Sequence, residues 1–262
     1  MLITTGDTDN PELFKRAASL AEHTGSCYVP RRGMSLGKLV QRSGGEQDVI
    51  VVIQNGARLV RPGQDPLTFH PSMGFIRAKR ILKGEQDPML EAARLEPGDT
   101  VLDCTAGLGT DSLLFSVGTG RDGKVIAIES SESLYALLKE GMSYYRSGLQ
   151  AVDEALSRIE LHRSEHLDIL REMPDRSADV IYFDPMFRDP ILDSSSISPL
   201  RMFANPEALA EESIREACRV ARKTVVLKEK RDSTEFARLG FTKVERGQTK
   251  TIYGVIHVDR LN

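Results

Sequence analysis

The stretch "VLDCTAGLGTD", residues 101–111, decides how this sequence folds. It opens with a short apolar run that is typical of a buried strand and that ends on an acid, Asp103. Gly107 and Gly109 then allow the backbone to turn tightly and to approach a ligand closely. A helix is predicted to begin at about Asp111. A strand, a glycine turn and a helix in this order predict one unit of a parallel α/β sheet.

The segments downstream repeat this alternation of strand and helix. Two final apolar segments follow one another closely and are predicted to pair as antiparallel neighbours. Together these patterns predict an α/β fold built on a doubly wound, seven-stranded, mainly parallel sheet with a terminal antiparallel hairpin. The predicted strands cover residues 100–104, 124–129, 158–162, 178–184, 224–230, 241–246 and 251–258.

The residues before this sheet predict a smaller α/β unit. Asn10 can cap a helix that begins at Pro11. "DVIVVIQNGARLV", residues 48–60, predicts a hairpin in which Asn55 and Gly56 adopt the positive φ angles of a tight turn. We expect these short elements to form a small α/β unit of their own.

The breaker-rich segment "RPGQDP", residues 61–66, marks a plausible boundary between the two units. A helix is predicted just after it, from about residue 71 to residue 83. We therefore expect residues 1–66 to form a small N-terminal α/β subdomain, residues 67–84 a basic connecting helix, and residues 85–262 the larger α/β domain.

Charge is distributed unevenly along the chain, although the net charge is only −3. Residues 1–83 contain 12 Lys and Arg against 7 Asp and Glu, and the remainder is acidic. This asymmetry is a hint of nucleic-acid contact by the basic part, while a solvated face is the simpler explanation of charge alone. The strongest basic cluster lies on the predicted connecting helix: Arg77, Lys79, Arg80 and Lys83.

Cysteine usage and hydropathy argue against several classes of protein. The three cysteines are widely separated and form no CxxC pair, so neither a disulfide framework nor a zinc site is expected. The N-terminus does not resemble a signal peptide, and no window approaches 18 consecutive apolar residues. We expect a cytoplasmic protein that needs neither a membrane nor a metal. No pattern indicates an oligomeric state.

The strand ends carry the residues that point to chemistry. In a doubly wound sheet, ligands bind beyond the carboxyl ends of the strands. Asp103 lies there beside the glycine turn, and Glu129 ends the next strand, where it could hold a ribose hydroxyl. A G-x-G turn alone also occurs as a purely structural feature. Ser112 replaces the third glycine of the dinucleotide fingerprint, which disfavours NAD and favours a nucleoside cofactor without a pyrophosphate.

A second acidic motif, "VIYFDPMF" at residues 180–187, ends the fourth predicted strand. Asp184 could simply cap the next turn, and Phe187 could be a core residue. Because this strand tip faces the glycine turn, we favour a functional role for both.

These motifs, with "AIES", "LHRSEHL" and "VVLKEKR", resemble class I S-adenosyl-L-methionine (SAM) methyltransferases, which have a Rossmann-like fold. They are most similar to the bacterial family that methylates guanine N2 in small-subunit (16S) ribosomal RNA and to its Gram-positive relatives of unassigned substrate. The resemblance covers roughly residues 85–262 and implies SAM as the cofactor. It also implies RNA methylation, a role in rRNA processing, and ribosomal RNA or the small ribosomal subunit as the partner.

The resemblance also implies which residues act. Thr110, Ser130 and Glu165 depart from the family pattern, which usually has Arg, Arg and Ser at these positions. The implied catalytic residues are Asp184, Pro185 and Phe187. The implied cofactor-binding residues are Asp103, Thr105, Gly107, Gly109, Thr110, Asp111, Glu129, Ser130, Ser164, Glu165 and Asp184.

The chemistry of an exocyclic amine gives the acidic motif a purpose. The nitrogen lone pair of such an amine is delocalised into the base, so the amine is a poor nucleophile. If Asp184 and the Pro185 carbonyl accept its two hydrogens, the lone pair can face the methyl donor. Phe187 can stack on the base. The motif therefore predicts methylation of a nucleobase amine, and the resemblance implies guanine N2 as that amine.

Other functions remain open from the sequence. A methyltransferase for a small molecule or a protein would not need the basic helix. A nicotinamide-dependent oxidoreductase would need the dinucleotide fingerprint that Ser112 interrupts. A binding module that has lost turnover would not need the intact acidic motif.

Overall fold

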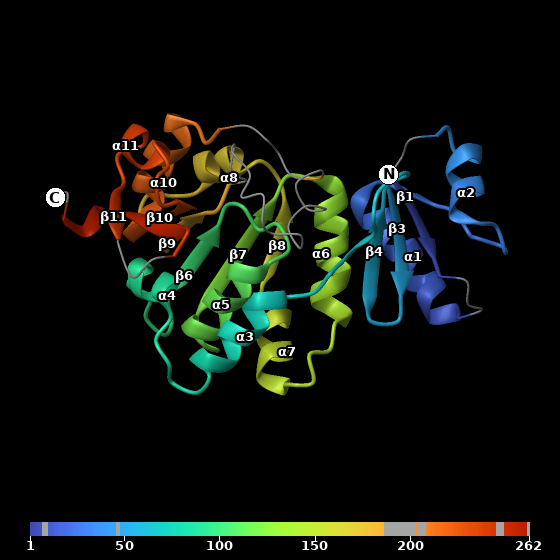
Figure 1. The fold of residues 1–262 in the computed structure, drawn as a ribbon, viewed down its shortest axis with the longest axis horizontal. Helices are drawn as coiled ribbons and strands as arrows, with labels where there is room; N and C mark the ends of the chain where they lie inside the picture. Colours follow the sequence, from blue (N-terminus) through green and yellow to red (C-terminus); the bar gives the residue numbers. More distant parts are fainter. Residues whose placement is uncertain (7–9, 46–47, 186–202, 204–207, 245–248, 261–262) are drawn as a thin grey trace.

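The computed structural model describes residues 1–6, 10–45, 48–185, 203, 208–244 and 249–260. These residues form two β-sheets, one of five strands and one of seven. Figure 1 shows the smaller sheet, built from the first part of the chain, lying beside helix α6 (Glu132–Tyr144) of the larger unit.

The smaller sheet has the strand order β2-β1-β3-β4-β5. Its first helix forms as the sequence predicts, because the Asn10 side chain accepts a hydrogen bond from the Glu12 amide and Pro11 occupies the first turn. Only the pairings β1–β3 and β3–β4 are longer than two residues, because β2 and β5 have two residues each. The elements are β1 (Leu2–Thr5), α1 (Pro11–Thr24), β2 (Cys27–Tyr28), α2 (Leu36–Arg42), β3 (Val49–Ile53), β4 (Gly56–Val60) and β5 (Leu67–Thr68).

The hairpin between β3 and β4 turns one residue earlier than predicted. Ile53 pairs with Gly56, so Gln54 and Asn55 form the loop and Gly56 already belongs to β4. Gly56 has a φ of 115°, whereas Asn55 is not among the described residues with positive φ. A Cβ atom on Gly56 would lie 3.4 Å from the Gly141 Cα, so this end of the hairpin is packed directly against α6.

The larger sheet has the order β11-β12-β10-β9-β6-β7-β8, which confirms the predicted seven-stranded, mainly parallel sheet. Strands β8, β7, β6, β9 and β10 are parallel, and β12 inserts antiparallel between β10 and β11. Strand β10 begins at Ala221, three residues before the predicted strand at residues 224–230. The strands are β6 (Thr100–Asp103), β7 (Lys124–Glu129), β8 (Glu160–Arg163), β9 (Ala178–Phe183), β10 (Ala221–Lys230), β11 (Thr242–Val244) and β12 (Thr251–His257).

Helices cover both faces of this sheet (Figure 1), and every residue of the central strand β9 is buried. Tyr182 of β9 packs toward the layer that contains α3–α7, and its neighbour Phe183 packs toward α8, α10 and α11. Among the described residues, no helix has the length and apolar character needed to cross a membrane. The helices not yet given are α3 (Ser72–Ile81), α4 (Pro88–Ala93), α5 (Thr110–Thr119), α7 (Gln150–Ser157), α8 (His166–Glu172), α10 (Glu211–Val220) and α11 (Glu235–Arg238).

A buried arginine joins the two sheets. Arg16 of α1 is 8% exposed and forms a 2.7 Å ion pair with Glu140 of α6. Its guanidinium also donates to the carbonyls of Ile53, Gln54 and Gly56 and lies 3.4 Å from the centre of the Tyr144 ring. One side chain therefore holds α1, the β3–β4 turn and α6 together.

Candidate active site

The glycine loop that follows β6 is fixed by hydrogen bonds to both neighbouring strands. The Cys104 amide donates to the Tyr182 carbonyl of β9, and the Ala106 amide donates to the Ile128 carbonyl of β7, both at 2.9 Å. Gly107 and Gly109 have φ angles of 55° and 67°, which are costly for residues with a Cβ atom. The loop is thus held rigidly at the carboxyl ends of the parallel strands.

Two buried carboxylates shape this loop. Asp103, at the end of β6, accepts hydrogen bonds from the Thr105 amide and the Ser112 hydroxyl. Glu129, at the end of β7, accepts from the amides of Gly107 and Ser131 at 2.9 and 2.8 Å. Both carboxylates therefore bind backbone N–H groups of the turns that surround the site.

Neither carboxylate is neutralised by a cation of the described chain, because Asp103 and Glu129 have no ion-pair partner there. Burial, reinforced by repulsion between Asp103 and other acids of the site, raises the pKa of each to about 7, although the hydrogen bonds to both oppose this shift. Glu165, at the start of α8, also repels Glu129. The tips of β6, β7 and β8 thus form a site with an excess of negative charge.

Asp184 directly follows β9 and lies next to the glycine loop. Its amide donates to the Thr105 hydroxyl at 2.6 Å, and its carboxylate lies 2.7 Å from the Lys228 ammonium of β10. Pro185, which follows it, is half-buried. Phe187, the third predicted catalytic residue, lies outside the described residues. The structure thus brings Asp184 and Thr105 together, as expected from adjacent strand tips.

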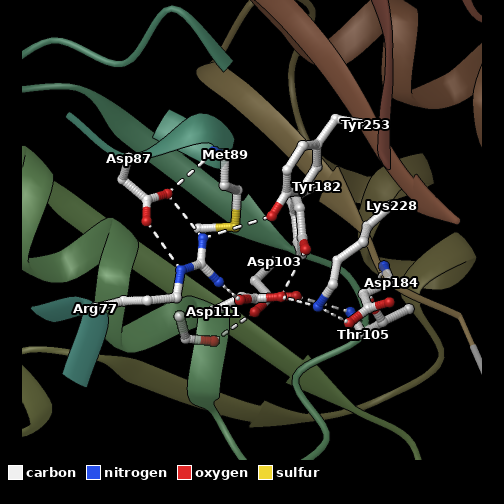
Figure 2. A network of polar contacts seen from close by, with 11 residues as sticks. Arg77, Asp87, Met89, Asp103, Thr105, Asp111, Tyr182, Asp184, Lys228 and Tyr253 are labelled. Atoms are coloured by element: carbon white, nitrogen blue, oxygen red, sulfur yellow. Dashed lines mark hydrogen bonds and ion pairs between the residues drawn. The ribbon is translucent and has the colours of Figure 1, made fainter. Parts of the chain in front are cut away.

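A network of ionised side chains extends from Asp184 across the site to α3 (Figure 2). Lys228 also contacts Asp111 of α5 at 2.8 Å. Arg77 approaches Asp111 from the opposite side at 3.2 Å and binds Asp87 through two nitrogens, at 2.9 and 2.7 Å. The Tyr182 hydroxyl donates to Asp111 at 2.6 Å. Asp111 therefore has three partners on three different elements.

The network has opposite effects on its two central acids, because the pKa of Asp111 is lowered and that of Asp184 is raised. Burial disfavours the charge on Asp111, yet Lys228 and Arg77 outweigh it and hold the pKa of Asp111 below its usual range. At Asp184, burial and repulsion by Asp111 outweigh Lys228, so the pKa is raised. The Asp184 side chain is still 28% exposed, so its burial is less complete than that of Asp111, at 7%. Asp184 is the acid of the pair that a ligand can reach.

Several residues of this network were missed or misassigned from the sequence. Arg77 was grouped with the basic face of its helix, but its guanidinium turns inward to Asp87 and Asp111. Lys228, near the end of a predicted strand, bridges two acids and does not point into solvent or toward a substrate phosphate site. The signals were weak but present: Arg77 lies one turn after the buried Gly74 on the same face of α3, and Lys228 lies two residues after the buried Val226 on the same side of β10.

The remaining predicted site residues lie at the expected edge of the sheet. Thr110 begins α5, beside Gly74 of α3, whose Cβ position would be only 2.9 Å from the Thr110 carbonyl. Ser130 follows β7, and Ser164 and Glu165 follow β8. Within the described ranges, no group of three or more His, Cys, Asp or Glu side chains is placed to hold a metal ion.

Comparison with known proteins identifies the family. The family model described as "Putative SAM-dependent methyltransferase" matches residues 68–248, which is more than half of the chain. The chain belongs to this family. It is therefore a SAM-dependent methyltransferase enzyme, and its cofactor is SAM.

Relatives of this methyltransferase differ in how much of the chain they match. "Uncharacterized protein YpiP" of Bacillus subtilis is 37% identical over 255 residues, covering 97% of this chain and 98% of the relative. "Ribosomal RNA small subunit methyltransferase J" of Halorhodospira halophila is 36% identical over 107 residues, covering 40% of this chain and 38% of the relative. This chain thus spans well under half the length of that relative.

A solved structure has the same fold as this methyltransferase along nearly its whole length. The SAM-dependent methyltransferase NGO1261 from Neisseria gonorrhoeae superposes with a TM-score of 0.63 and covers 98% of this chain and 96% of its own. At 19% identity the likeness shows the fold, including the smaller N-terminal part.

The described residues of this methyltransferase fit SAM. The cofactor carries a positively charged sulfonium, an ammonium group and ribose hydroxyls. The uncompensated carboxylates at the tips of β6 and β7 provide negative charge and hydrogen-bond acceptors for such a ligand. The absence of a third glycine, with Ser112 bound to Asp103 in its place, agrees with a cofactor that has no pyrophosphate.

Proposed function

We propose that this methyltransferase transfers a methyl group to an exocyclic amine of a nucleobase, with guanine N2 of small-subunit ribosomal RNA as the target. The observation that carries the proposal is the position of Asp184 and Pro185. They end β9 beside the glycine loop, and the Asp184 carboxylate remains partly exposed. The similarity of part of the chain to small-subunit ribosomal RNA methyltransferases supports an RNA substrate.

The proposed chemistry needs hydrogen-bond acceptors at this strand tip. The Asp184 carboxylate and the Pro185 carbonyl accept the two amine hydrogens, which turns the nitrogen lone pair toward the donor. Bound SAM supplies the methyl group on a positively charged sulfur. Asp184 or water would accept the proton that the amine nitrogen gives up when it takes the methyl group from sulfur. Positioning provides most of the rate, because little proton transfer is required beforehand.

We assign Asp103 and Glu129 to the cofactor, with Glu129 as the acceptor for the ribose. With pKa values of about 7, both gain charge as the pH rises from about 6 to 8. A cationic ligand favours the ionised carboxylates, so SAM affinity should increase with pH over this range, by at most about tenfold per pH unit for each group. Titration calorimetry at several pH values measures the trend.

Two comparisons isolate the cause of this pH dependence. S-adenosylhomocysteine lacks the sulfonium charge but keeps the ammonium group, so its affinity should depend less on pH. Glu129→Gln removes one titrating group and should likewise flatten the trend for SAM. Equal pH dependence for both ligands would contradict the placement of the sulfonium near these acids.

The outer face of α3 is our proposed contact for RNA. Lys79 and Arg80 are exposed on α3, as are the apolar side chains of Met73 and Ile76, and Lys83 is exposed in the turn that follows the helix. Arg77 is excluded because it faces the site. We expect the triple substitution of the three exposed cations by Gln to weaken RNA binding. Each lost phosphate contact should flatten the dependence of log affinity on log salt concentration by about 0.7–0.9.

A matched variant tests whether the loss of exposed cations elsewhere on the protein has the same effect on RNA binding. Arg121 and Lys124 are also exposed, but they lie at the amino end of β7, away from the strand tips. Their replacement by Gln should leave the salt dependence of RNA binding unchanged, and neither variant should change SAM affinity. If both variants behave alike, α3 is not a specific RNA contact.

The experiment that decides the substrate is mass spectrometry of modified nucleosides. Small-subunit ribosomal RNA from cells with and without this gene is digested and compared, and the purified enzyme is then given the unmethylated RNA with labelled SAM. The expected result is an N2-methylguanosine that disappears with the gene and is restored in vitro. Unchanged nucleosides in all RNA would favour the alternative of a small-molecule or protein substrate.

A further inference from the structure

Lys228 has a position that the proposed chemistry leaves unexplained. It lies near the end of β10, and its ammonium contacts Asp184 at 2.7 Å and Asp111 at 2.8 Å. The side chain is 22% exposed, so most of it is enclosed by the protein. Both acid partners flank the site, since Asp111 lies in the first turn of α5 and Asp184 directly follows β9.

The geometry points to Lys228 as a positioning residue: we propose that it favours the ionised form of the Asp184 carboxylate and aims it at the substrate amine. This inference rests on the proposed role of Asp184 as the acceptor of the amine hydrogens. Lys228 occupies one carboxylate oxygen, Oδ2, and the backbone amide of Asp184 is tied to Thr105. Asp184 is therefore held at its backbone by Thr105 and at one carboxylate oxygen by Lys228, which leaves the other oxygen to face a ligand.

Lys228 is needed because acidic groups outnumber cations around Asp184, and Lys228 is the cation that contacts its carboxylate. A buried carboxylate beside other carboxylates tends to take up a proton. A protonated Asp184 would carry a donor on one oxygen and could no longer orient the amine in the same way. The ionisable groups around it are Asp111 of α5, Asp103 of β6, Tyr182 of β9, Lys228 and Glu229 of β10, Tyr253 of β12 and Arg77 of α3.

The ammonium of Lys228 is itself held in place by the other half of the network. Asp111 is fixed by Tyr182 and by Arg77, and Arg77 is fixed by Asp87, whose carboxylate also caps the start of α4 through the Met89 amide. Lys228 therefore has one immobile partner and one partner at the exposed edge of the site. Because its contact with Asp111 is fixed, the Lys228 ammonium can hold the more exposed Asp184 carboxylate in one orientation.

The test is Lys228→Met, compared with Lys223→Met. Lys223 also bridges two acids, Glu96 and Asp99, but it lies near the amino end of β10, whereas Lys228 lies near the carboxyl end. Two measurements are made on each variant. The first is the pKa of Asp184 by carbon NMR of carboxyl-labelled protein, assigned with Asp184→Asn. The second is the single-turnover rate of methyl transfer to unmethylated ribosomal RNA against pH, beside SAM affinity.

In Lys228→Met we expect the pKa of Asp184 to rise, because a cation no longer favours the carboxylate. Activity that needs the carboxylate is lost as pH falls through this pKa, so the acidic limb of the rate profile should move to higher pH. At neutral pH the rate should fall by about 10²-fold, with SAM affinity unchanged. Lys228→Arg, which keeps the charge, should restore part of the rate. Lys223→Met should change none of these quantities.

An unchanged pKa of Asp184 in Lys228→Met would overturn the inference, and so would a shift that Lys223→Met reproduces. If Lys228→Met does not fold, Lys228→Gln gives the same comparison, because its amide can donate to the acids without carrying charge. The NMR measurement needs no substrate. A raised pKa with no methylation of RNA by the unmodified enzyme would therefore refute the proposed substrate while upholding the role of Lys228.

Discussion

Replacement of Asp184 by alanine is expected to lower the single-turnover rate of methyl transfer by about 10²–10³-fold, the usual effect of losing one preorganised electrostatic contact. The amine loses the acceptor that orients its lone pair. The fold should survive, because Asp184 lies after the last residue of β9 and Lys228 keeps its second partner, Asp111. The measurement is transfer of labelled methyl to unmethylated small-subunit ribosomal RNA, with SAM affinity determined on the same preparation.

Two further variants define what the loss means. Asp184→Asn should be milder than Asp184→Ala, because an amide oxygen can still accept one amine hydrogen. Asp122→Ala removes an exposed acid before β7 and should transfer methyl at the normal rate. Near-normal transfer by Asp184→Ala, in a folded protein that binds SAM, would reduce the motif to a structural turn.

The largest effect on stability is expected from Arg16→Met. The substitution leaves Glu140 charged and buried without its partner, and it removes the donor from three backbone carbonyls of the β3–β4 turn. Breaking a buried ion pair from one side typically costs about 3–5 kcal/mol of the free energy of unfolding. Urea denaturation followed by circular dichroism measures this loss.

The matched control is Arg121→Met, because Arg121 forms an ion pair with Glu154 that is largely exposed to solvent. This variant should have nearly the same free energy of unfolding as the unmodified protein. If Arg16→Met proves equally harmless, the contact between the two sheets does not depend on the buried pair.

The main features of the fold could be predicted from the sequence because they are encoded locally. The glycine turn after Asp103 and the repeated strand-helix order determine a parallel sheet, and two closely spaced final strands determine the antiparallel addition. The prediction fails at the β3–β4 turn, where the local sequence is compatible with two neighbouring turn positions. The β3–β4 loop uses Gln54 and Asn55 because Gly56 is needed beside Gly141 of α6, a contact far away in sequence.

The candidate site could be predicted only in part, for a related reason. Acids at strand tips can be located from the sequence, since the carboxyl ends of parallel strands meet at one edge. The partner of each acid cannot, because Arg77 and Asp111 are separated by 34 residues and Lys228 and Asp111 by 117. A positive side chain on a helix or strand gives no local sign of whether it faces solvent or a buried carboxylate.

The insertion of β12 between β10 and β11 has a consequence for synthesis of the chain. Until residues 251–257 have been made, β10 is an edge strand with unpaired backbone groups, although the glycine loop and the first five strands of the larger sheet already exist. Tyr253, which pairs with Lys228 across β10 and β12, would be missing from the surroundings of Arg77. A nascent chain could thus form its cofactor loop before its acid network is enclosed. Until β12 pairs with it, the unpaired edge of β10 can also pair with strands of other chains.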